Sequence, residues 1–308
     1  MKAETSAIVY RSTGSWYTVK TQEQWVQCRI KGRLRLKGIK STNPVAVGDR
    51  VMIAFENDTE GIITDVLPRE NYIIRKSVNL SKQTHIIAAN IDQVFLLITL
   101  NNPPTFTAFI DRFLVTAEAY QIPAVLVFNK LDTYSTAEKE TLEDLKELYQ
   151  SIGYDCYSIS ALNQEGVDQI RNLMRNKVSM FSGHSGVGKS TLINAIAPNL
   201  NLKTAAISEQ HQQGQHTTTF AEMFDLPDAC RIIDTPGIKG FGIVDMEPEE
   251  IGPYFVEFEQ YLSQCKFHNC RHVHEPQCGV KDAVDRGEIA GSRYRSYLQL
   301  LEDDSQYR

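Results

Sequence analysis

Short runs of alternating hydrophobic and polar residues fill the first part of the chain. Residues 6–11, 15–20 and 25–30 are β-prone segments separated by glycine or polar turns, residues 45–51 lead into a fourth strand, and 61–66 into a fifth. Five short strands in so small a unit predict a β-barrel of the OB type, although an SH3-like barrel would leave nearly the same pattern.

A different pattern begins near residue 92, where apolar runs alternate with segments of helical spacing. Residues 93–100 and 124–128 are apolar runs, as expected for strands buried on both faces, and helical spacing occupies 107–120 and 137–152. Further strands are predicted at 156–159, 178–181 and 231–233, and a helical stretch at 192–196. This alternation predicts a doubly wound α/β domain.

Beyond residue 245 the chain becomes acidic and helical. We predict one helix over 248–263, because Pro and Glu stand at its start as they do at many helix N-termini, and two more near 280–286 and 292–301. The expected architecture is therefore multidomain, with domains at 1–75, 76–246 and 247–308.

The composition is that of an ordinary globular protein. Of the 308 residues, 42% are hydrophobic and 23% charged, and the longest apolar runs, 94–100 and 123–128, are far too short to span a bilayer. The N-terminus lacks the basic-then-apolar pattern of a signal peptide. We expect a cytoplasmic monomer that has no membrane partner.

The net charge of −6 is unevenly distributed. Basic residues exceed acidic ones by 13 to 8 over residues 1–80, whereas acidic residues exceed basic ones by 12 to 7 over 247–308. The basic excess is concentrated in a segment without acidic residues that contains Arg29, Lys31, Arg33, Arg35 and Lys37. This is the form of an RNA-binding footprint, but a solvated strand and loop would look the same, and the segment alone favours neither interpretation.

A glycine-rich segment carries the first chemical motif. Residues 183–190 read Gly-His-Ser-Gly-Val-Gly-Lys-Ser and fit the pattern G-x-x-x-x-G-K-[ST] between a predicted strand and a predicted helix. Its glycines let backbone N–H groups wrap a β-phosphate, Lys189 reaches the β- and γ-phosphates, and the Ser190 hydroxyl ligates Mg²⁺.

The motif that reads the base precedes this phosphate loop, whereas in most GTPases it follows. Asn129-Lys130-Leu131-Asp132, after the strand at 124–128, resembles the guanine-reading Asn-Lys-x-Asp. The Asp132 carboxylate accepts hydrogen bonds from guanine N1–H and the 2-amino group, a donor pair that adenine lacks. Lys130 would lie along the base, and the loop Ser160-Ala161-Leu162 resembles one that contacts guanine O6 through a backbone N–H.

Two further segments are expected to sense the γ-phosphate. Asp234-Thr235-Pro236-Gly237 follows the strand at 231–233, so the Asp234 carboxylate suits Mg²⁺ and the Gly237 N–H suits the γ-phosphate. A run of three threonines precedes it in the chain. We favour Thr218 as the one that closes on Mg²⁺ and the γ-phosphate, with Thr217 as the next choice.

The residue after this Asp-x-x-Gly segment is Ile238, where many GTPases carry a Gln that orients the attacking water. An apolar side chain cannot do this, so intrinsic hydrolysis is predicted to be slow. His216 is the candidate for positioning the water and His184 a weaker one, although both are also compatible with exposed loop histidines.

A cluster of cysteines and histidine predicts a structural metal site. Cys265, Cys270, His272 and Cys278 supply three thiolates and one imidazole within 14 residues, the number that a closed tetrahedral Zn²⁺ site needs. His268 or His274 could take the place of His272.

Together the motifs resemble one family, the circularly permuted ribosome small-subunit-dependent GTPases (ribosome small-subunit-dependent GTPase A). The resemblance covers almost the whole chain and includes 47–51, 110–114, 183–191, 234–237 and 275–278. It implies an OB-type barrel, a circularly permuted P-loop GTPase domain and a mainly helical zinc-binding domain. It also implies a role in late maturation of the 30S subunit, with GTP hydrolysis slow alone and faster on the subunit. Gln215 departs from the family, in which an Arg often precedes the histidine.

The sequence therefore predicts a GTPase that binds the 30S subunit and its rRNA and hydrolyses GTP to GDP and phosphate. Two alternatives stay open: an RNA-binding assembly module that holds GTP as a structural ligand, and a GTPase that acts on a protein partner or a membrane. The predicted GTP-binding residues are Asn129, Lys130, Asp132, Ser160, Ala161, Gly183, His184, Ser185, Gly186, Val187, Gly188, Lys189, Ser190, Thr191, Asp234 and Gly237. The predicted catalytic residues are Lys189, His216 and Thr218, and the predicted Mg²⁺ ligands are Ser190, Thr218 and Asp234.

Overall fold

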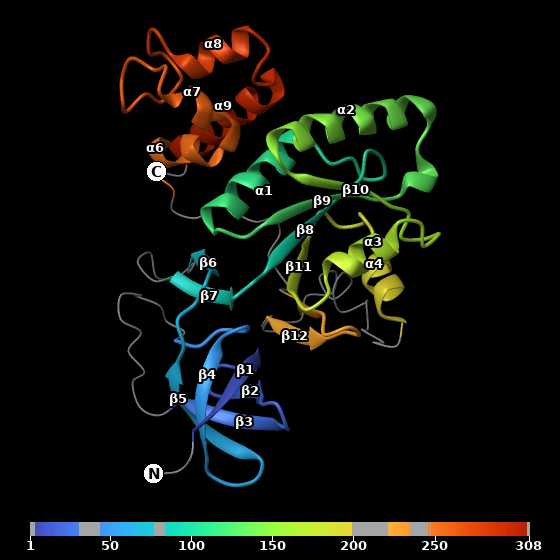
Figure 1. The fold of residues 1–308 in the computed structure, drawn as a ribbon, viewed down its shortest axis with the longest axis vertical. Helices are drawn as coiled ribbons and strands as arrows, with labels where there is room; N and C mark the ends of the chain where they lie inside the picture. Colours follow the sequence, from blue (N-terminus) through green and yellow to red (C-terminus); the bar gives the residue numbers. More distant parts are fainter. Residues whose placement is uncertain are drawn as a thin grey trace. The chain divides into compact units, whose positions relative to one another are not determined.

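The computed structural model describes residues 4–30, 44–76, 84–198, 221–234, 246 and 248–306 (Figure 1). The chain divides into two compact units. The first is drawn from residues 1–94, 167–181 and 190–238, and the second from residues 95–166, 182–189 and 239–308. Both units contain segments that are far apart in the sequence.

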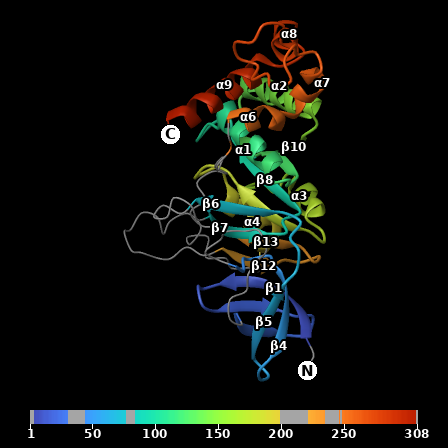
Figure 2. The same cartoon turned by 90° about the vertical axis from the view of Figure 1, so that its left-hand side faces the viewer.

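The N-terminal part of the first unit is a five-stranded barrel (Figure 2). Its strands are β1 (Glu4–Ser12), β2 (Tyr17–Lys20), β3 (Trp25–Ile30), β4 (Arg50–Phe55) and β5 (Glu60–Val66). They follow the order β1-β2-β3-β5-β4, β4 pairs back onto β1, and only the β3–β5 pairing within this ring is parallel.

Alternation along these strands forms the barrel core. The inward positions are occupied mainly by aliphatic residues that are fully buried, among them Val9, Val19, Val26, Ile53 and Ile63. Since successive side chains of a strand point to opposite faces, the period of two noted in the sequence is the period of burial. The predicted OB-type barrel is confirmed.

A two-stranded ribbon follows the barrel. It consists of β6 (Tyr72–Lys76) and β7 (Thr84–Ala89), which pair antiparallel and were not anticipated from the sequence. The predicted domain limit after residue 75 falls within β6, and the ribbon belongs to the same compact unit as the barrel.

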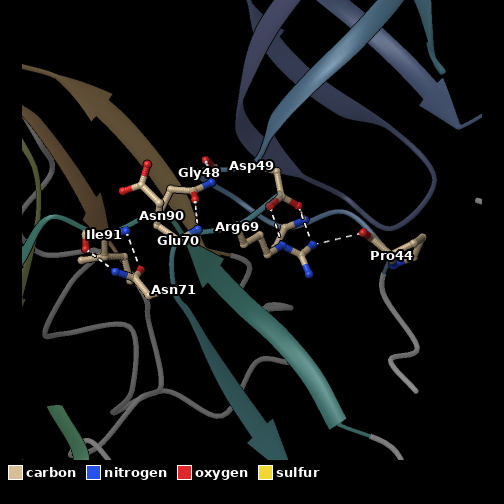
Figure 3. Close-up of polar contacts among 9 residues, drawn as sticks. Pro44, Gly48, Asp49, Arg69, Glu70, Asn71, Asn90 and Ile91 are labelled. Atoms are coloured by element: carbon tan, nitrogen blue, oxygen red, sulfur yellow. Dashed lines mark hydrogen bonds and ion pairs between the residues drawn. The ribbon is translucent and has the colours of Figure 1, made fainter. Parts of the chain in front are cut away.

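A buried polar cluster fixes the junction between barrel and ribbon (Figure 3). The Asp49 carboxylate, 0% exposed, accepts hydrogen bonds from Arg69 Nε at 2.6 Å, from Arg69 Nη2 at 2.7 Å and from the Ala46 N–H at 2.8 Å. A bidentate pair of this kind is geometrically specific because both planar groups must face each other.

Gly48, next to this pair, cannot be replaced without moving the ribbon. Its φ is +89°, and a Cβ built on it would lie 2.0 Å from the Ala89 carbonyl oxygen. The Asn90 side-chain amide also donates to the Gly48 carbonyl at 3.0 Å (Figure 3). The Val-Gly-Asp-Arg-Val segment at 47–51 is therefore explained by a close approach of two backbones and a buried ion pair.

Three strands of α/β type complete the sheet of the first unit. β13 (Arg231–Asp234) pairs parallel with β11 (Val178–Ser182) and antiparallel with β12 (Glu222–Asp225). β12 in turn pairs antiparallel with β1 of the barrel. In the chain, the helix α3 (Val167–Leu173) precedes β11, and the helix α4 (Lys189–Ile196) follows it.

Strands and helices alternate in the second unit, as predicted. β9 (Ala124–Phe128) lies between β8 (Gln93–Ile98) and β10 (Asp155–Ser158), and β9 and β10 are parallel. The connections contain α1 (Thr107–Ala119), the short 3₁₀ helix η1 (Leu131–Thr133) and α2 (Thr136–Ile152). α2 begins at a capping box, in which Ser135 and Glu138 bond each other's backbone N–H, and ends at Gly153 with φ +113°.

The single helix predicted over 248–263 is wrong. That segment forms α6 (Pro248–Ile251), the 3₁₀ turns η3 (Gly252–Tyr254) and η4 (Val256–Phe258), and α7 (Glu259–Leu262). Pro253 interrupts the helix because it lacks an N–H and disfavours helical geometry in the residue before it, Gly252. The two later helices are confirmed as α8 (Gly279–Asp285) and α9 (Gly291–Gln306).

A buried charge network joins α9 to the α/β part of the second unit. Arg293 on α9 is 0% exposed and donates to Asp111 on α1 at 2.8 Å and to Glu257 at 2.6 and 2.9 Å. Tyr149 on α2 donates its hydroxyl to the same Asp111 oxygen at 2.8 Å. Although burial lowers it, the two carboxylates raise the pKa of Arg293 above its ordinary value. The shared contact with Asp111 thereby ties α9 to α1 and α2.

Candidate nucleotide and metal sites

One side chain holds the guanine motif and the phosphate loop together. Asn129, 2% exposed at the end of β9, donates from Nδ2 to the Val187 carbonyl at 2.8 Å and accepts at Oδ1 from the Ala161 N–H at 3.0 Å. Its own carbonyl accepts the Tyr134 hydroxyl at 2.7 Å. The three loops that the sequence assigned to one nucleotide are therefore fixed to one amide.

The other residues of the guanine motif are oriented by the same neighbourhood. Asp132 is exposed, and one of its carboxylate oxygens accepts the Ser160 hydroxyl. Lys130 has left-handed backbone geometry (φ +66°), and its Nζ donates to the Asn102 carbonyl at 2.6 Å. The Asp132 carboxylate is therefore accessible from solvent, and the Lys130 side chain is held by its terminal amine.

The phosphate loop follows β11 and turns through glycines with positive φ. At Gly188 (φ +96°) a Cβ would lie 2.3 Å from Asn129 Nδ2, and at Gly183 (φ +139°) 2.6 Å from the Leu97 carbonyl oxygen. Both positions exclude any larger side chain because another part of the site already occupies the space. Val187, 0% exposed, anchors the loop from within.

Two side chains of the phosphate loop, those of Lys189 and His184, have defined partners. Lys189 Nζ donates to the carbonyl oxygens of Gly183 and His184 at 2.6 and 2.8 Å. The His184 ring packs on Phe109 of α1, with centroids 3.9 Å apart. Burial, and secondly the charge of Lys189, lower the pKa of His184, which favours the neutral imidazole.

Two predicted magnesium ligands lie on elements of the first unit. Ser190 follows Lys189 in the first turn of α4, and Asp234 ends β13. β11 and β13 are parallel neighbours, so the carboxyl ends of the strands that lead to these residues meet at one edge of the sheet. A hydroxyl and a carboxylate are ligand types that suit Mg²⁺, so the residues present fit the ion that a nucleotide brings.

Several predicted site residues lie outside the described residues. They are His216, Thr217, Thr218, Gly237 and Ile238 of the γ-phosphate segments, and Lys31, Arg33, Arg35 and Lys37 of the basic segment. Of the proposed RNA-binding residues, Arg29 is described and lies exposed on β3.

The four predicted zinc ligands come together. The ligand atoms of Cys265, Cys270, His272 and Cys278 all lie within 4.8 Å of one another. Individual separations are 3.6 Å from Cys265 Sγ to His272 Nδ1, 3.3 Å from His272 Nδ1 to Cys278 Sγ, and 4.0 Å between the latter thiol and Cys265. Zn–S and Zn–N bonds of tetrahedral zinc place ligand atoms about 3.5–3.8 Å apart, so the set fits Zn²⁺. The histidine grouped with the three cysteines is His272 rather than His268 or His274.

The surroundings of this cluster hold the ligands in place. His272 is 4% exposed with φ +58°, and Tyr294 donates its hydroxyl to the His272 carbonyl at 2.6 Å. The Glu275 carboxylate accepts backbone N–H bonds from Arg271, Val273 and His274. Burial acts to raise the pKa of Glu275, but these donors outweigh it and bring that pKa down to about 2.

Comparison with known proteins identifies the family. Residues 7–63 match the RsgA N-terminal domain, and residues 66–244 match the RsgA GTPase. The chain belongs to the RsgA GTPase family. A relative from Christiangramia forsetii named small ribosomal subunit biogenesis GTPase RsgA is 65% identical over 97% of both chains, and one of the same name from Bacteroides fragilis is 56% identical over 98% of both.

Solved structures support the same family. The crystal structure of YjeQ from Thermotoga maritima superposes with a TM-score of 0.81 at 36% identity and covers 98% of both chains. YloQ, described as a circularly permuted GTPase, superposes with a TM-score of 0.78 at 30% identity over 99% of this chain and 96% of its own. YloQ thus resembles this RsgA-family chain in being circularly permuted, and the predicted fold class is confirmed.

Sequence reasoning missed one supporting residue of this RsgA-family site. Tyr134 is 6% exposed, accepts the Leu100 N–H at 3.0 Å and donates to the Asn129 carbonyl. Tyr134 follows the guanine motif by two residues, and this proximity was the only feature of the sequence that could have indicated its role. In the part of the chain that the structure describes, no helix is both long and apolar enough to cross a membrane.

Proposed function

We propose that this chain is a GTP hydrolase that binds the small ribosomal subunit and its RNA and acts in the maturation of that subunit. The observation that carries the nucleotide part is the position of Asn129, whose amide bonds the phosphate loop on one side and the guanine-contact loop on the other. The relatives' names carry the ribosomal part. GTP, GDP and the 30S subunit are the expected partners, and the cytoplasm the expected compartment, with the protein acting as a monomer.

The described residues have defined tasks in this reaction. Asp132 selects guanine, Lys130 lies along the base, and the backbone of 183–188 surrounds the β-phosphate. Lys189 exchanges its present carbonyl partners for phosphate oxygens, which places its charge where negative charge builds up during phosphoryl transfer. Mg²⁺, when bound with the nucleotide, neutralises the charge on the β- and γ-phosphates, and Ser190, Asp234 and Thr218 are the residues that would hold it.

Hydrolysis itself is assigned to the segment around His216. Ile238 offers no polar atom to an attacking water, so His216 positions the water and Thr218 closes on the γ-phosphate. Since this leaves the isolated protein with an incomplete site, we expect slow turnover that the subunit accelerates. The C-terminal region, residues 247–308, would be held by one structural Zn²⁺ on the three thiolates and His272, and the barrel, residues 1–75, would supply RNA contacts through Arg29 and the basic residues after it.

GTP turnover with and without purified 30S subunits tests the proposal. We expect slow release of phosphate alone and a clear acceleration with subunits. The competing idea, an RNA-binding assembly module that holds GTP as a structural ligand, gains if GTP binds but no phosphate is released in either condition. Binding to subunits that is indifferent to salt would argue for a protein contact instead of phosphate contacts.

Two substitutions separate base selection from chemistry. Asp132→Asn should weaken GTP binding and favour xanthosine triphosphate, because the amide that replaces the carboxylate is complementary to the hydrogen-bonding edge of xanthine. An unchanged base preference refutes the guanine assignment. His216→Ala should lower subunit-stimulated turnover while GTP binding stays at the level of the unaltered protein. Wild-type turnover in that variant would remove His216 from the mechanism.

A further inference from the structure

The outer face of strands β2 and β3 carries an aromatic and basic surface. Lys20 pairs with Trp25 and Thr18 with Gln27 in the antiparallel register. Along β3 exposed and buried residues alternate, so Trp25, Gln27 and Arg29 share the outer face. In barrels of the OB type, the face of the second and third strands is where oligonucleotides bind.

Each tryptophan on this face has a cation over its ring. Lys20 Nζ lies 5.1 Å from the centroid of Trp25, and the Arg29 guanidinium lies 4.6 Å from that of Trp16, just before β2. Trp25 and Arg29 are four residues apart on one strand, which corresponds to about 13 Å. The two aromatic–cation pairs therefore form successive positions along one extended surface.

The Trp25 pair is held in place from the neighbouring strand. Tyr10 of β1 meets the Trp25 ring edge-on, with centroids 4.8 Å apart, and donates its hydroxyl to Asp225 at 2.5 Å. Asp225 also accepts Lys20 and lies 3.6 Å from Arg231. Although burial acts to raise it, the hydrogen bonds from Lys20 and Tyr10 lower the pKa of Asp225, so the carboxylate stays charged and fixes the cluster. A surface fixed in this way loses little entropy when a ligand stacks on it.

A hollow adjoins this cluster. It has a volume of about 770 Å³ and is lined by Tyr10 and Lys20 together with Gln24, Phe55 and Arg231. This is within the usual volume range of small-ligand sites. Trp25, which meets Tyr10 edge-on, has 50% of its surface exposed, an unusual state for the largest apolar side chain.

Resting on the proposed function, we propose that this face, defined by Trp16, Lys20, Trp25 and Arg29, binds unpaired nucleotides of RNA by stacking bases on the tryptophans. Other proteins bind single-stranded nucleic acid with this combination of exposed aromatic rings and cations. Duplex RNA does not fit, because its bases are already stacked on one another. In the sequence, Lys31, Arg33, Arg35 and Lys37 follow Arg29 and add positive charge.

The charges of this face match a contact made mainly by stacking. Asp225 bonds Lys20, and Glu56 lies 4.0 Å from Arg29, so each of the two cations already has an acidic partner. A cross-strand Lys–Trp pair also stabilises the β2–β3 hairpin, but that role does not require half of the ring to stay exposed. The binding energy is therefore assigned to the rings, and salt dependence to the residues that follow Arg29.

Tryptophan fluorescence reads this surface directly, because Trp16 and Trp25 are the two tryptophans of the whole chain. The full chain is titrated with a 12-nucleotide oligouridylate and, separately, with a 12-base-pair RNA duplex. We expect the single strand to quench the fluorescence and the duplex to leave it nearly unchanged. Trp25→Ala should weaken the single strand roughly 5- to 150-fold, with Trp16 left as reporter, whereas Trp25→Phe should keep most of the affinity.

A matched control distinguishes this surface from any exposed aromatic ring. Phe267 is 41% exposed and has Lys266 Nζ 5.7 Å from its centroid, but it lies in the C-terminal region. Phe267→Ala should leave oligouridylate binding unchanged. Neither Lys20→Met nor Trp25→Ala should change the salt dependence, because Lys20 is already paired with Asp225 and the indole ring carries no charge.

Equal quenching by the duplex, unchanged binding by Trp25→Ala, or equal weakening by Phe267→Ala would each overturn the inference. GTP turnover with 30S subunits, measured on the same preparations, separates it from the proposed function. Stimulated turnover without any quenching refutes this surface alone, whereas quenching without turnover refutes the hydrolase and leaves the surface standing.

Discussion

Arg293→Met tests how strongly the C-terminal helices are held to the α/β part of the second unit. The substitution removes a fully buried cation that bonds Asp111 at 2.8 Å and Glu257 at 2.6 and 2.9 Å, and it leaves both carboxyl groups without their shared partner. Breaking a buried pair by removing one partner costs about 3–5 kcal/mol, because the remaining charge is desolvated without compensation. Burial already raises the pKa of Asp111, so in the variant this carboxyl should take up a proton more readily.

The assay is native-state hydrogen exchange of the amides in α1 and α9, with urea unfolding as a second readout. A loss of about 3–5 kcal/mol corresponds to exchange through local opening that is faster by roughly 150- to 5,000-fold. Asp111→Asn combined with Arg293→Met should recover part of the loss, since no unpaired Asp111 charge remains. Arg286→Met is the matched control, because its pair with Glu288 is on the same region but exposed, and no measurable change is expected. Exchange in α1 and α9 at the unaltered rate in Arg293→Met would refute the reasoning.

Three further outcomes are expected. Gly188→Ala places a Cβ against Asn129 Nδ2 and should lower GTP affinity at least about tenfold. The control is Gly153→Ala, at a glycine that also has a positive φ but no atom within 4 Å of the added Cβ, and it should leave GTP affinity unchanged. Equal affinities of the two variants in a nucleotide titration would contradict this. Mass spectrometry of the intact chain should find one zinc ion. Cys270→Ser or a chelator should remove the zinc and reduce the helical circular dichroism signal, whereas Cys230→Ser should keep both. A folded chain without metal would exclude the site. Because the pKa of His184 is lowered in the folded protein, the unfolded state binds more protons than the folded state as pH falls below 6.5. The free energy of unfolding should therefore decrease on acidification in that window and recover when the pH is raised. An NMR titration of His184 with a midpoint above 6.5 would contradict this.

The pattern of local residue types predicted most of the elements. Apolar runs marked β8 and β9 because both are buried along nearly their whole length, and the Gly-x-x-x-x-Gly-Lys-Ser order predicted the phosphate loop because backbone N–H groups at that site tolerate no side chains. The error at 248–263 came from weighing a favourable helix start above the Gly252-Pro253 step that ends it.

Long-range pairings could not be predicted in the same way. Arg293 and Asp111 are 182 residues apart, and no local pattern says which buried acid an arginine will meet. The role of Asn129 as a support for the phosphate loop was also missed, because the sequence motif indicates what the residue type is used for and not which backbone it contacts. The γ-phosphate segment and most of the basic segment lie outside the described residues, so the roles of His216 and Thr218 stay predictions.

The bonds of Asn129 also set an order of events during synthesis. Its Oδ1 partner, Ala161, follows 32 residues later in the chain, and its Nδ2 partner, Val187, follows 58 residues later. At a synthesis rate of roughly 5–20 residues per second, the second partner appears about 3–12 s after Asn129 itself. A nascent chain therefore completes its guanine-reading loops first and cannot retain a nucleotide until the phosphate loop has emerged. In a chain with the usual motif order, the phosphate loop would be made first and could wait for its base-reading half with nucleotide phosphates already in place.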